Sequence, residues 1–487
     1  MDTNSGIGAS SILFQNEAKS LFLIDIPHSI ALAQDLPPKP TADQDTSSQQ
    51  KERFLARRKR LLSKPPLEAP YPSSNEPRKE AARAKVLESI PPGERRFHGD
   101  FIRPLVNAAL HDLHDNYSTR QCQWCLPRYV IDSGEDVGSG ARKRKNESLE
   151  ENESFERPDS SNTAKKSCDS SYNVPPLILS TTSTNTFSSR SDLRGVVKNP
   201  SLDSAVLSIK TSQRGDTSGF SEYLVPPKSC FVHCTLPLAS ATPIDNPIPG
   251  ITPSQKFNLI VFDPPWPNRS VRRSGHYKTY NYTEMDILTQ RLQDILRVHA
   301  HDQSSEPSAQ TSRHDPPKES QKTIAAIWIT NSRNARQAAY AAMLSTGFRV
   351  SEEWIWIKTT VDGQPVSPVD GLWKRPYEIL VVGKKTVLSQ PPVIHSLLSS
   401  PPDLDSMGID PESIKRRVIA AVPDLHSRKP CLKEIFEKLF YMTAPPEERT
   451  RQPYTGLEVF ARNLTAGWWA CGNEVLKFND RKYWHED

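Results

Sequence analysis

The sequence predicts an α/β fold in its C-terminal half, with a mostly parallel sheet covered by helices on both faces. Short apolar runs of strand type alternate there with helical segments, and this alternation is typical of parallel sheets. One run, residues 257–263, ends in the carboxylate of Asp263 and is followed at once by Pro264, Pro265 and Trp266. Ligands bind at the carboxyl ends of strands in such sheets, so this run also marks the expected site.

Each expected element carries a local signal. The expected strands are short apolar runs, several of them rich in β-branched and aromatic residues, a composition that suits a buried strand. They comprise residues 231–235, 257–263, 324–330, 354–357, 379–382 and 457–460. We expect helices between them at the alanine-rich residues 334–344 and at residues 432–440.

The rest of the chain is expected to hold little packed core. Of its 487 residues, 43 are proline and only 36% are hydrophobic, so much of the chain cannot bury a core. We expect a mostly disordered N-terminus at residues 1–50, a helical region at 51–130 and a disordered Ser- and Asn-rich linker at 131–218. The α/β domain then spans residues 219–487, with low-complexity inserts at 300–322 and 388–410.

Composition also bears on location and partners. No stretch of 18 or more apolar residues occurs, so no membrane span is expected, and seven scattered cysteines favour a reducing compartment. Basic clusters lie at residues 57–60 and 142–145 within a net charge of +5. Such clusters are typical of nuclear-import signals or nucleic-acid contacts, or else of a solvated linker. We expect a nuclear protein, with the cytoplasm as a further location.

The corner at Asp263 has a composition that suits a planar ligand bearing an amino group. The two prolines fix two φ angles and remove two N–H donors, while their carbonyls remain acceptors. Asp263 adds a carboxylate, and Trp266 offers a flat face for stacking. Adenine, with its exocyclic amine, is such a ligand. The alternative is a strand that ends in this tetrapeptide by chance, which average residue usage makes rare, in well under about 1% of chains this long.

These residues resemble the catalytic motif of the MT-A70 family of S-adenosylmethionine-dependent adenine N6-methyltransferases. The likeness continues at residues 268–274, 374–378, 457–463, 467–468 and 472–478 and is most similar to the methyltransferase-like-four branch. It covers about residues 220–480. The resemblance implies a Rossmann-like, circularly permuted class I methyltransferase sheet, since the Asp263 motif precedes the cofactor-like segment.

The resemblance also implies which residues bind S-adenosylmethionine. Asp263, Phe460, Arg462 and Asn463 would lie around the methionine and ribose, and Asn473 and Glu474 would bind the ribose and adenine edge. Lys374 would reach the cofactor carboxylate or the target base. Thr235 stands where many relatives carry an acidic residue, a departure that implies either weaker cofactor binding or a different alignment of this strand. Residues 426–430 also fit the family pattern, and we assign them a structural role because Pro430 can open a helix.

The loop after the corner predicts nucleic-acid binding. It holds cations that attract phosphate and aromatic rings that stack on bases, namely Arg269, Arg272, Arg273, Tyr277, Lys278 and Tyr280. The alternative is an ordinary solvated loop. In the expected chemistry, Asp263 and the Pro264 carbonyl accept hydrogen bonds from the adenine amine, Trp266 stacks on the base, and the methyl donor lies in line about 3–3.5 Å away.

We therefore expect an N6-adenine methyltransferase acting on RNA, such as a small nuclear RNA, or on DNA, without an obligate protein partner. One alternative is a catalytically silent subunit that binds nucleic acid or a partner. Another is a methyltransferase of proteins or small molecules, which the basic aromatic loop disfavours. No metal is expected at the active site. Four residues outside the domain, His111, His114, Cys122 and Cys125, have zinc-ligand spacing, but exposed helix polars at His111 and His114 and a core cysteine at Cys125 are the favoured interpretation.

Overall fold

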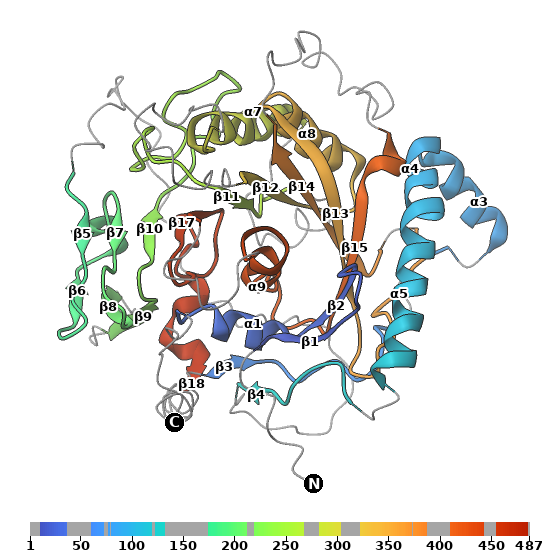
Figure 1. The fold of residues 1–487 in the computed structure, drawn as a ribbon, viewed down its shortest axis with the longest axis horizontal. Helices are drawn as coiled ribbons and strands as arrows, with labels where there is room; N and C mark the ends of the chain where they lie inside the picture. Colours follow the sequence, from blue (N-terminus) through green and yellow to red (C-terminus); the bar gives the residue numbers. More distant parts are fainter. Residues whose placement is uncertain are drawn as a thin grey trace, which may run out of the picture.

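A twelve-stranded sheet forms the centre of the protein in the computed structural model (Figure 1). The structure describes residues 10–36, 60–72, 76–77, 79–118, 122–131, 174–211, 219–266, 282–302, 322–372, 374–386, 410–442 and 454–485. The strands follow the order β1-β2-β15-β13-β14-β12-β11-β16-β17-β10-β7-β5. The seven that form the α/β core are β10 (Cys230–His233), β17 (Trp469–Gly472), β16 (Gly456–Val459), β11 (Leu259–Phe262), β12 (Ile324–Ile329), β14 (Tyr377–Lys385) and β13 (Phe348–Lys358).

The pairing confirms the expected α/β class and its permuted order. β11 is parallel to β12 on one side and to β16 on the other, and β16, β17 and β10 continue in parallel. Within this core β14 alone is antiparallel, to both β12 and β13. β11 precedes β16 in the chain yet lies beside it in the sheet, so the strand with the carboxylate corner comes first.

Both faces of the sheet are covered, because successive side chains of its central strands point into two separate apolar clusters. In β11, Ile260 and Phe262 join the cluster under α7 (Tyr282–His299) and α8 (Arg333–Leu344). Leu259 and Val261 join the opposite cluster with α1 (Ile26–Leu32), α9 (Lys433–Phe436) and the π-helical turn η7 (Glu437–Tyr441). Figure 1 shows α7 and α8 on one side and α1 and α9 on the other.

The N-terminus joins this sheet, so the expectation of disorder is wrong for residues 10–36. β1 (Ile12–Gln15) pairs with β2 (Leu21–Ile24), and β2 runs parallel to β15 (Lys415–Ala421). All four residues of β2 are buried. The apolar run of β2 is visible in the sequence. Its partner strand β15 lies nearly four hundred residues further along the chain, so no local pattern predicts their pairing.

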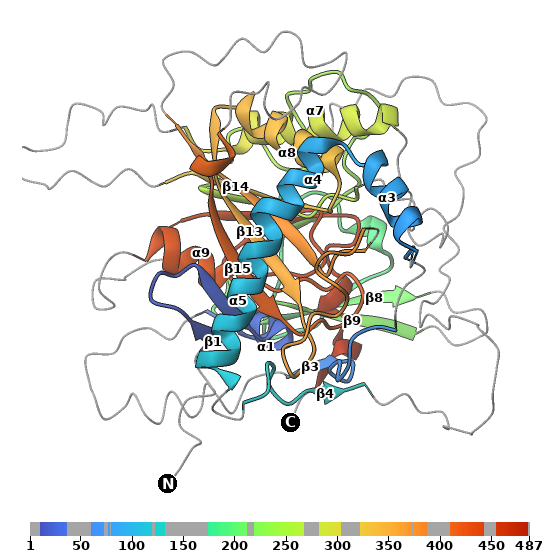
Figure 2. The same cartoon turned by 90° about the vertical axis from the view of Figure 1, so that its right-hand side faces the viewer.

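Helices are present in the region 51–130, and they pack on the sheet. They are α3 (Glu80–Ser89), α4 (Pro92–Arg96), the π-helical turn η1 (Phe97–Ile102) and α5 (Arg103–Asn116). Val106, Leu110 and Leu113 of α5 are buried in the cluster of the α7–α8 face. Figure 2 shows α5 lying across β13 and β15. Two short strands flank the helices, β3 (Arg60–Ser63) and β4 (Tyr129–Val130), and β3 also pairs with β18 (Trp484–His485).

Residues 174–211, expected within a disordered linker, form strands, so that expectation is wrong for them. β5 (Leu177–Ile178) and β7 (Val197–Lys198) extend the large sheet beyond β10. β6 (Asn185–Phe187), β8 (Ala205–Thr211) and β9 (Gly219–Val225) form a separate three-stranded sheet. A few buried apolar residues, among them Val197 and Leu207, suffice because they pack against β10 and the segment after β17.

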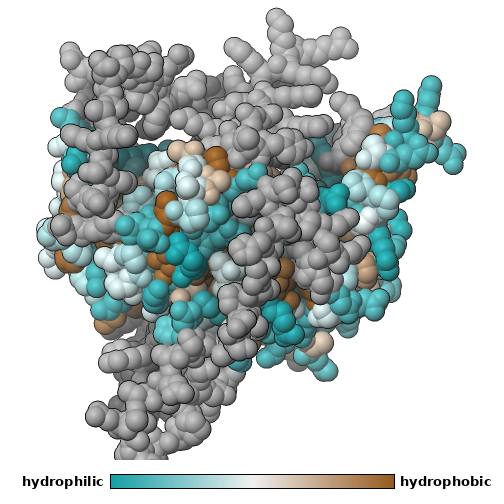
Figure 3. Space-filling model, turned by 90° about the horizontal axis from the view of Figure 1, so that it is seen from above, coloured by the Kyte–Doolittle hydropathy of each residue, from teal (hydrophilic) through white to brown (hydrophobic). Residues whose placement is uncertain are grey.

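Several expected features lie outside the described residues. They include most of both inserts, the basic loop after Trp266, the cluster at 142–145 and residues 57–59 of the other basic cluster. Among the described helices, none is long and apolar enough to cross a membrane. The described part of the face in Figure 3 intersperses hydrophilic and hydrophobic residues.

Candidate active site

Asp263 lies directly after β11 at the carboxyl edge of the sheet. Its backbone N–H donates to the Val459 carbonyl of β16 over 3.1 Å, which extends the ladder by one residue. The Trp266 N–H donates to the Pro264 carbonyl over 2.8 Å and closes the corner. The Asp263 side chain is only 16% exposed. The corner is therefore rigid and holds a half-desolvated carboxylate.

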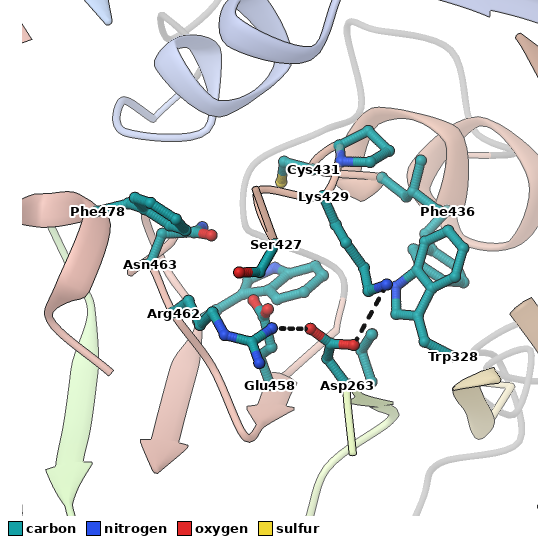
Figure 4. A pocket seen from close by; sticks show the side chains of 14 residues that line it. Asp263, Trp328, Ser427, Lys429, Cys431, Phe436, Glu458, Arg462, Asn463 and Phe478 are labelled. Carbon is teal, nitrogen blue, oxygen red and sulfur yellow. Dashed lines mark hydrogen bonds and ion pairs between the residues drawn. The ribbon is translucent and has the colours of Figure 1, made fainter. Parts of the chain in front are cut away.

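This carboxylate is the centre of a chain of alternating charges. Arg462 donates to Oδ2 of Asp263, and the Lys429 ammonium lies 3.5 Å from Oδ1 (Figure 4). Lys429 also donates to Glu378, whose other oxygen is 2.6 Å from Lys358. The chain continues on the other side of Arg462. Its Nε donates to Glu474 over 3.0 Å, and Lys477 donates to the second oxygen of Glu474, also over 3.0 Å.

The pKa shifts follow from these pairs. Burial opposes the ionisation of Glu378, but Lys358 and Lys429 hold its pKa well below the ordinary value. Burial alone would lower the pKa of Lys429, yet Asp263 and Glu378 raise it above the ordinary value. Glu378 and Lys429 therefore stay charged at neutral pH. Glu458 of β16 differs, because burial and the neighbouring charge of Asp263 raise its pKa to about 8.

Two adjoining hollows meet at Asp263. The smaller has a volume of about 40 Å³ and includes Glu458 and Asn463 in its lining. The larger is a cleft of about 310 Å³ that Pro264 and Pro265 line, at the lower end of the usual range for ligand pockets. Both hollows share a wall made by Asp263, Trp328, Ser427, Lys429 and Arg462. A group in either hollow can thus reach the same carboxylate.

Trp266 does not have the free stacking face that the sequence predicts. Its side chain lies in the core of the α7–α8 face, it is 7% exposed, and its indole N–H donates to the Trp328 carbonyl over 2.6 Å. The indole thereby ties the corner to the end of β12. The Pro264 carbonyl is also partly used, since it accepts the bond from the Trp266 backbone and keeps one lone pair.

The structure brings some predicted cofactor residues to Asp263 and leaves others apart. Arg462 and Asn463 line the smaller hollow. Phe460 directly follows β16 with a φ of 60° and lies against Gly472 at the end of β17. Glu474 reaches the site through Arg462.

Thr235 and Asn473 are exposed and line neither hollow, although both follow strands that end at this edge of the sheet. The ends of these strands are joined by a hydrogen bond from the Cys234 N–H to the Gly472 carbonyl over 3.3 Å. Lys374 is exposed and lines neither hollow. The substrate residues expected between 269 and 280 lie outside the described part of the chain.

The sequence did not identify Lys429, Glu378 or Lys358 as site residues. Lys429 lies within the segment 426–430, to which we assigned a structural role, and it is central to the site. Glu378 is the second residue of β14. Because β14 is antiparallel, its first residues meet the carboxyl ends of its parallel neighbours, which the rule of strand carboxyl ends does not predict. The resemblance at residues 374–378, which includes Glu378, was the one signal in the sequence that pointed to this residue.

The structure shows the surroundings of His111, His114, Cys122 and Cys125, the four residues with zinc-ligand spacing. His111 lies 3.2 Å from the carboxylate of Asp115 on the exposed face of α5, and the His114 ring contacts Trp124. Cys125 is buried and Cys122 is exposed. Within the described ranges, no group of three or more His, Cys, Asp or Glu residues is arranged to hold a metal ion.

Comparison with known proteins agrees with this geometry. Residues 316–474 match the family model described as MT-A70. Over 98% of its length the chain is 27% identical to "N6-methyladenosine RNA methyltransferase MTA1" of Cryphonectria parasitica, of which it covers 95%. It is 26% identical to the protein of the same name from Pyricularia oryzae, of which it covers 96%. It is 30% identical over 54% of its length to "N(6)-adenine-specific methyltransferase METTL4" of Mus musculus, of which it covers 45%. With its permuted sheet and this match, the chain contains an MT-A70 methyltransferase domain.

Proposed function

We propose that this protein transfers a methyl group from S-adenosylmethionine to N6 of adenine in RNA. The observation that carries the proposal is the position of Asp263, a rigid carboxylate on the wall shared by two hollows. One hollow can serve the methyl donor and the other the acceptor base. RNA is favoured over DNA because the two fungal relatives that match nearly the whole chain are named as RNA methyltransferases.

The side chains around Asp263 fit the methyl donor in kind. Lys429 and Arg462 are cations suited to a carboxylate, and Asn463 offers an amide to hydroxyl groups. The bound cofactor supplies an electrophilic methyl on a sulfonium, a cation that the carboxylate of Asp263 attracts. The smaller hollow alone, at about 40 Å³, has room for only a few water molecules. The donor must therefore extend into the larger cleft or along the edge toward Phe460 and Glu474.

On the acceptor side, Asp263 supports the amine. Each carboxylate oxygen has a cation partner and still keeps lone-pair capacity for an N–H donor. A carboxylate that accepts from the amine favours the positive charge that develops on the nitrogen during transfer. Arg462 and Lys429 hold this carboxylate in one orientation. Positioning of the two reacting atoms then contributes much of the rate.

The test is incubation of the full chain with labelled S-adenosylmethionine and matched RNA and DNA oligonucleotides, followed by nucleoside mass spectrometry. We expect label in N6-methyladenosine from RNA, and we expect Asp263→Asn, which keeps the shape of the side chain, to abolish it. Label in N6-methyldeoxyadenosine alone would replace RNA by DNA as the substrate. Binding of oligonucleotides with no transfer to either would favour the silent binding subunit and contradict the proposed activity.

We infer nuclear residence from the basic residues 57–60 and 142–145, and a fluorescent fusion with both clusters changed to alanine tests it. We also infer a monomer that needs no obligate protein partner, which light scattering of the active protein tests.

A further inference from the structure

The larger cleft has an aromatic wall that comes from the N-terminal half of the chain. Tyr71 lines it together with Asp263, Pro264 and Pro265. The tyrosine is 57% exposed, whereas the three cleft tryptophans Trp266, Trp328 and Trp356 are between 4% and 7% exposed. Among the described tyrosines and tryptophans that line the cleft, Tyr71 is thus the one with an accessible ring.

The backbone holds Tyr71 at this place. Its N–H donates to the Val366 carbonyl over 2.9 Å, and the Val366 N–H donates to the carbonyl of Lys358 over 3.0 Å. Lys358 ends β13 and belongs to the charge chain of the site. Tyr71 is therefore two backbone hydrogen bonds away from a residue that lines the same cleft.

Proline restricts the segment on both sides of Tyr71. Pro70 precedes it and Pro72 follows it, so two φ angles are fixed and Tyr71 itself is kept in an extended conformation. Four residues before Tyr71, the Leu67 carbonyl accepts a hydrogen bond from the Val361 N–H over 2.9 Å. Tyr71 is also absent from the three apolar clusters of the described residues. A rigid backbone thus presents a ring that does not serve the core.

An exposed aromatic residue on its own is ordinary. Here a fixed backbone places it at a cleft whose inner end is the carboxylate corner. The Asp263 side chain is 16% exposed, so the acceptor base must enter the cleft to reach it. A ring more than half exposed lies nearer to solvent, where the next nucleotide of the strand would remain. Bases of any sequence stack on such rings.

We propose that Tyr71 stacks on the base of a nucleotide that flanks the acceptor adenine, and so binds the single-stranded substrate. This inference rests on the proposed function and adds a binding residue from outside the MT-A70 match. Tyr71 contributes to binding of nucleic acid and takes no part in the transfer itself.

The experiment compares wild type with Tyr71→Phe, Tyr71→Ala and Phe220→Ala. Phe220 is a matched control, since it is 55% exposed on β9 and lines neither hollow. Stacking lost with Tyr71→Ala raises KM for a short RNA about tenfold or more, with kcat and the KM for S-adenosylmethionine unchanged. Tyr71→Phe and Phe220→Ala keep the wild-type KM. A wild-type KM in Tyr71→Ala, or a fall in kcat alone, would overturn the inference.

A second substrate identifies which base is stacked. In an RNA whose acceptor adenosine has abasic neighbours, the ratio of KM between Tyr71→Ala and wild type falls to about one, because the flanking base is gone. A ratio that stays high shows contact elsewhere and contradicts the flanking-base assignment. Fluorescence anisotropy of the same RNAs separates this inference from the proposed function. Weaker RNA binding by Tyr71→Ala supports it even where wild type transfers no methyl.

Discussion

Glu458 gives the most specific stability prediction of the site. It lies on β16, paired across the ladder with Val261, and lines the smaller hollow beside Asp263. Burial, and then the charge of Asp263, raise its pKa from 4.5 to about 8, against the opposing effect of Arg462. At neutral pH the folded protein therefore keeps this carboxyl protonated. Asp263 then has Glu458 as a neutral neighbour.

The magnitude follows from proton linkage. Between pH 4.5 and about 8 the folded state holds a proton that the unfolded chain releases, so the free energy of unfolding falls as pH rises. The contribution is complete below pH 4.5 and lost once the pH exceeds about 8. The difference between the two pKa values corresponds to an upper value of about 5 kcal/mol. Because local relaxation reduces such penalties, we expect about 2–4 kcal/mol.

Glu458→Gln isolates this effect, since glutamine resembles the protonated acid in shape and does not titrate. Urea unfolding of both proteins from about pH 5 to pH 9 measures it. We expect similar stability at the acidic end and a variant more stable by about 2–4 kcal/mol at the basic end. Introducing Asp263→Asn into both proteins should lower the folded pKa of Glu458 and narrow the gap between the two stability curves, because the neutral amide removes a charge that opposes ionisation of Glu458. Parallel curves over the whole range would refute the protonated Glu458.

Two further changes test the charge network and the docking of the N-terminal helices. Lys429→Met should lower kcat strongly, because it removes the cation 3.5 Å from Asp263. Lys358→Met should lower kcat much less, because Lys358 contacts Glu378 and not Asp263. Equal losses of kcat in steady-state assays would contradict this difference. Arg336→Met should cost about 3–5 kcal/mol in urea unfolding, because it leaves a charge buried without its partner 2.6 Å away. A loss under about 1 kcal/mol would show that this pair contributes as little as a surface ion pair.

The carboxylate corner was predictable because its signal is local. A strand of four buried residues, a terminal Asp263 and two prolines specify both the element and its rigid end. The parallel strands on either side then bring Arg462 and Asn463 to the same edge, as the permuted order implies. What the residues could not specify is the burial of Trp266. The residue that accepts its N–H, Trp328, lies on another strand, and only the packed sheet shows that the ring is taken up in the core.

The N-terminal half was the least predictable part, because its order depends on distant partners. Glu94 is buried in a short helix of low apolar content, and its ionised form is stabilised by Arg336 of α8 and by His98. Burial lowers the pKa of His98 to about 4, so this histidine stays neutral and bridges Glu94 to the Tyr377 hydroxyl. The periodicity of apolar residues in the sequence carries no information about a buried polar network of this kind.

These contacts bear on how large the functional unit is. Arg428, next to Lys429, donates to the Leu62 carbonyl over 2.9 Å, so the segment 60–72 supports the loop that carries the site lysine. Tyr377, next to Glu378, is held by a hydrogen bond between its hydroxyl and the His98 ring. Both site residues thus have neighbours fixed from the N-terminal half. A protein reduced to residues 316–474 would lack Asp263 as well as these supports. The residues that support the site therefore extend over both halves of the chain, in agreement with relatives that match 98% of it.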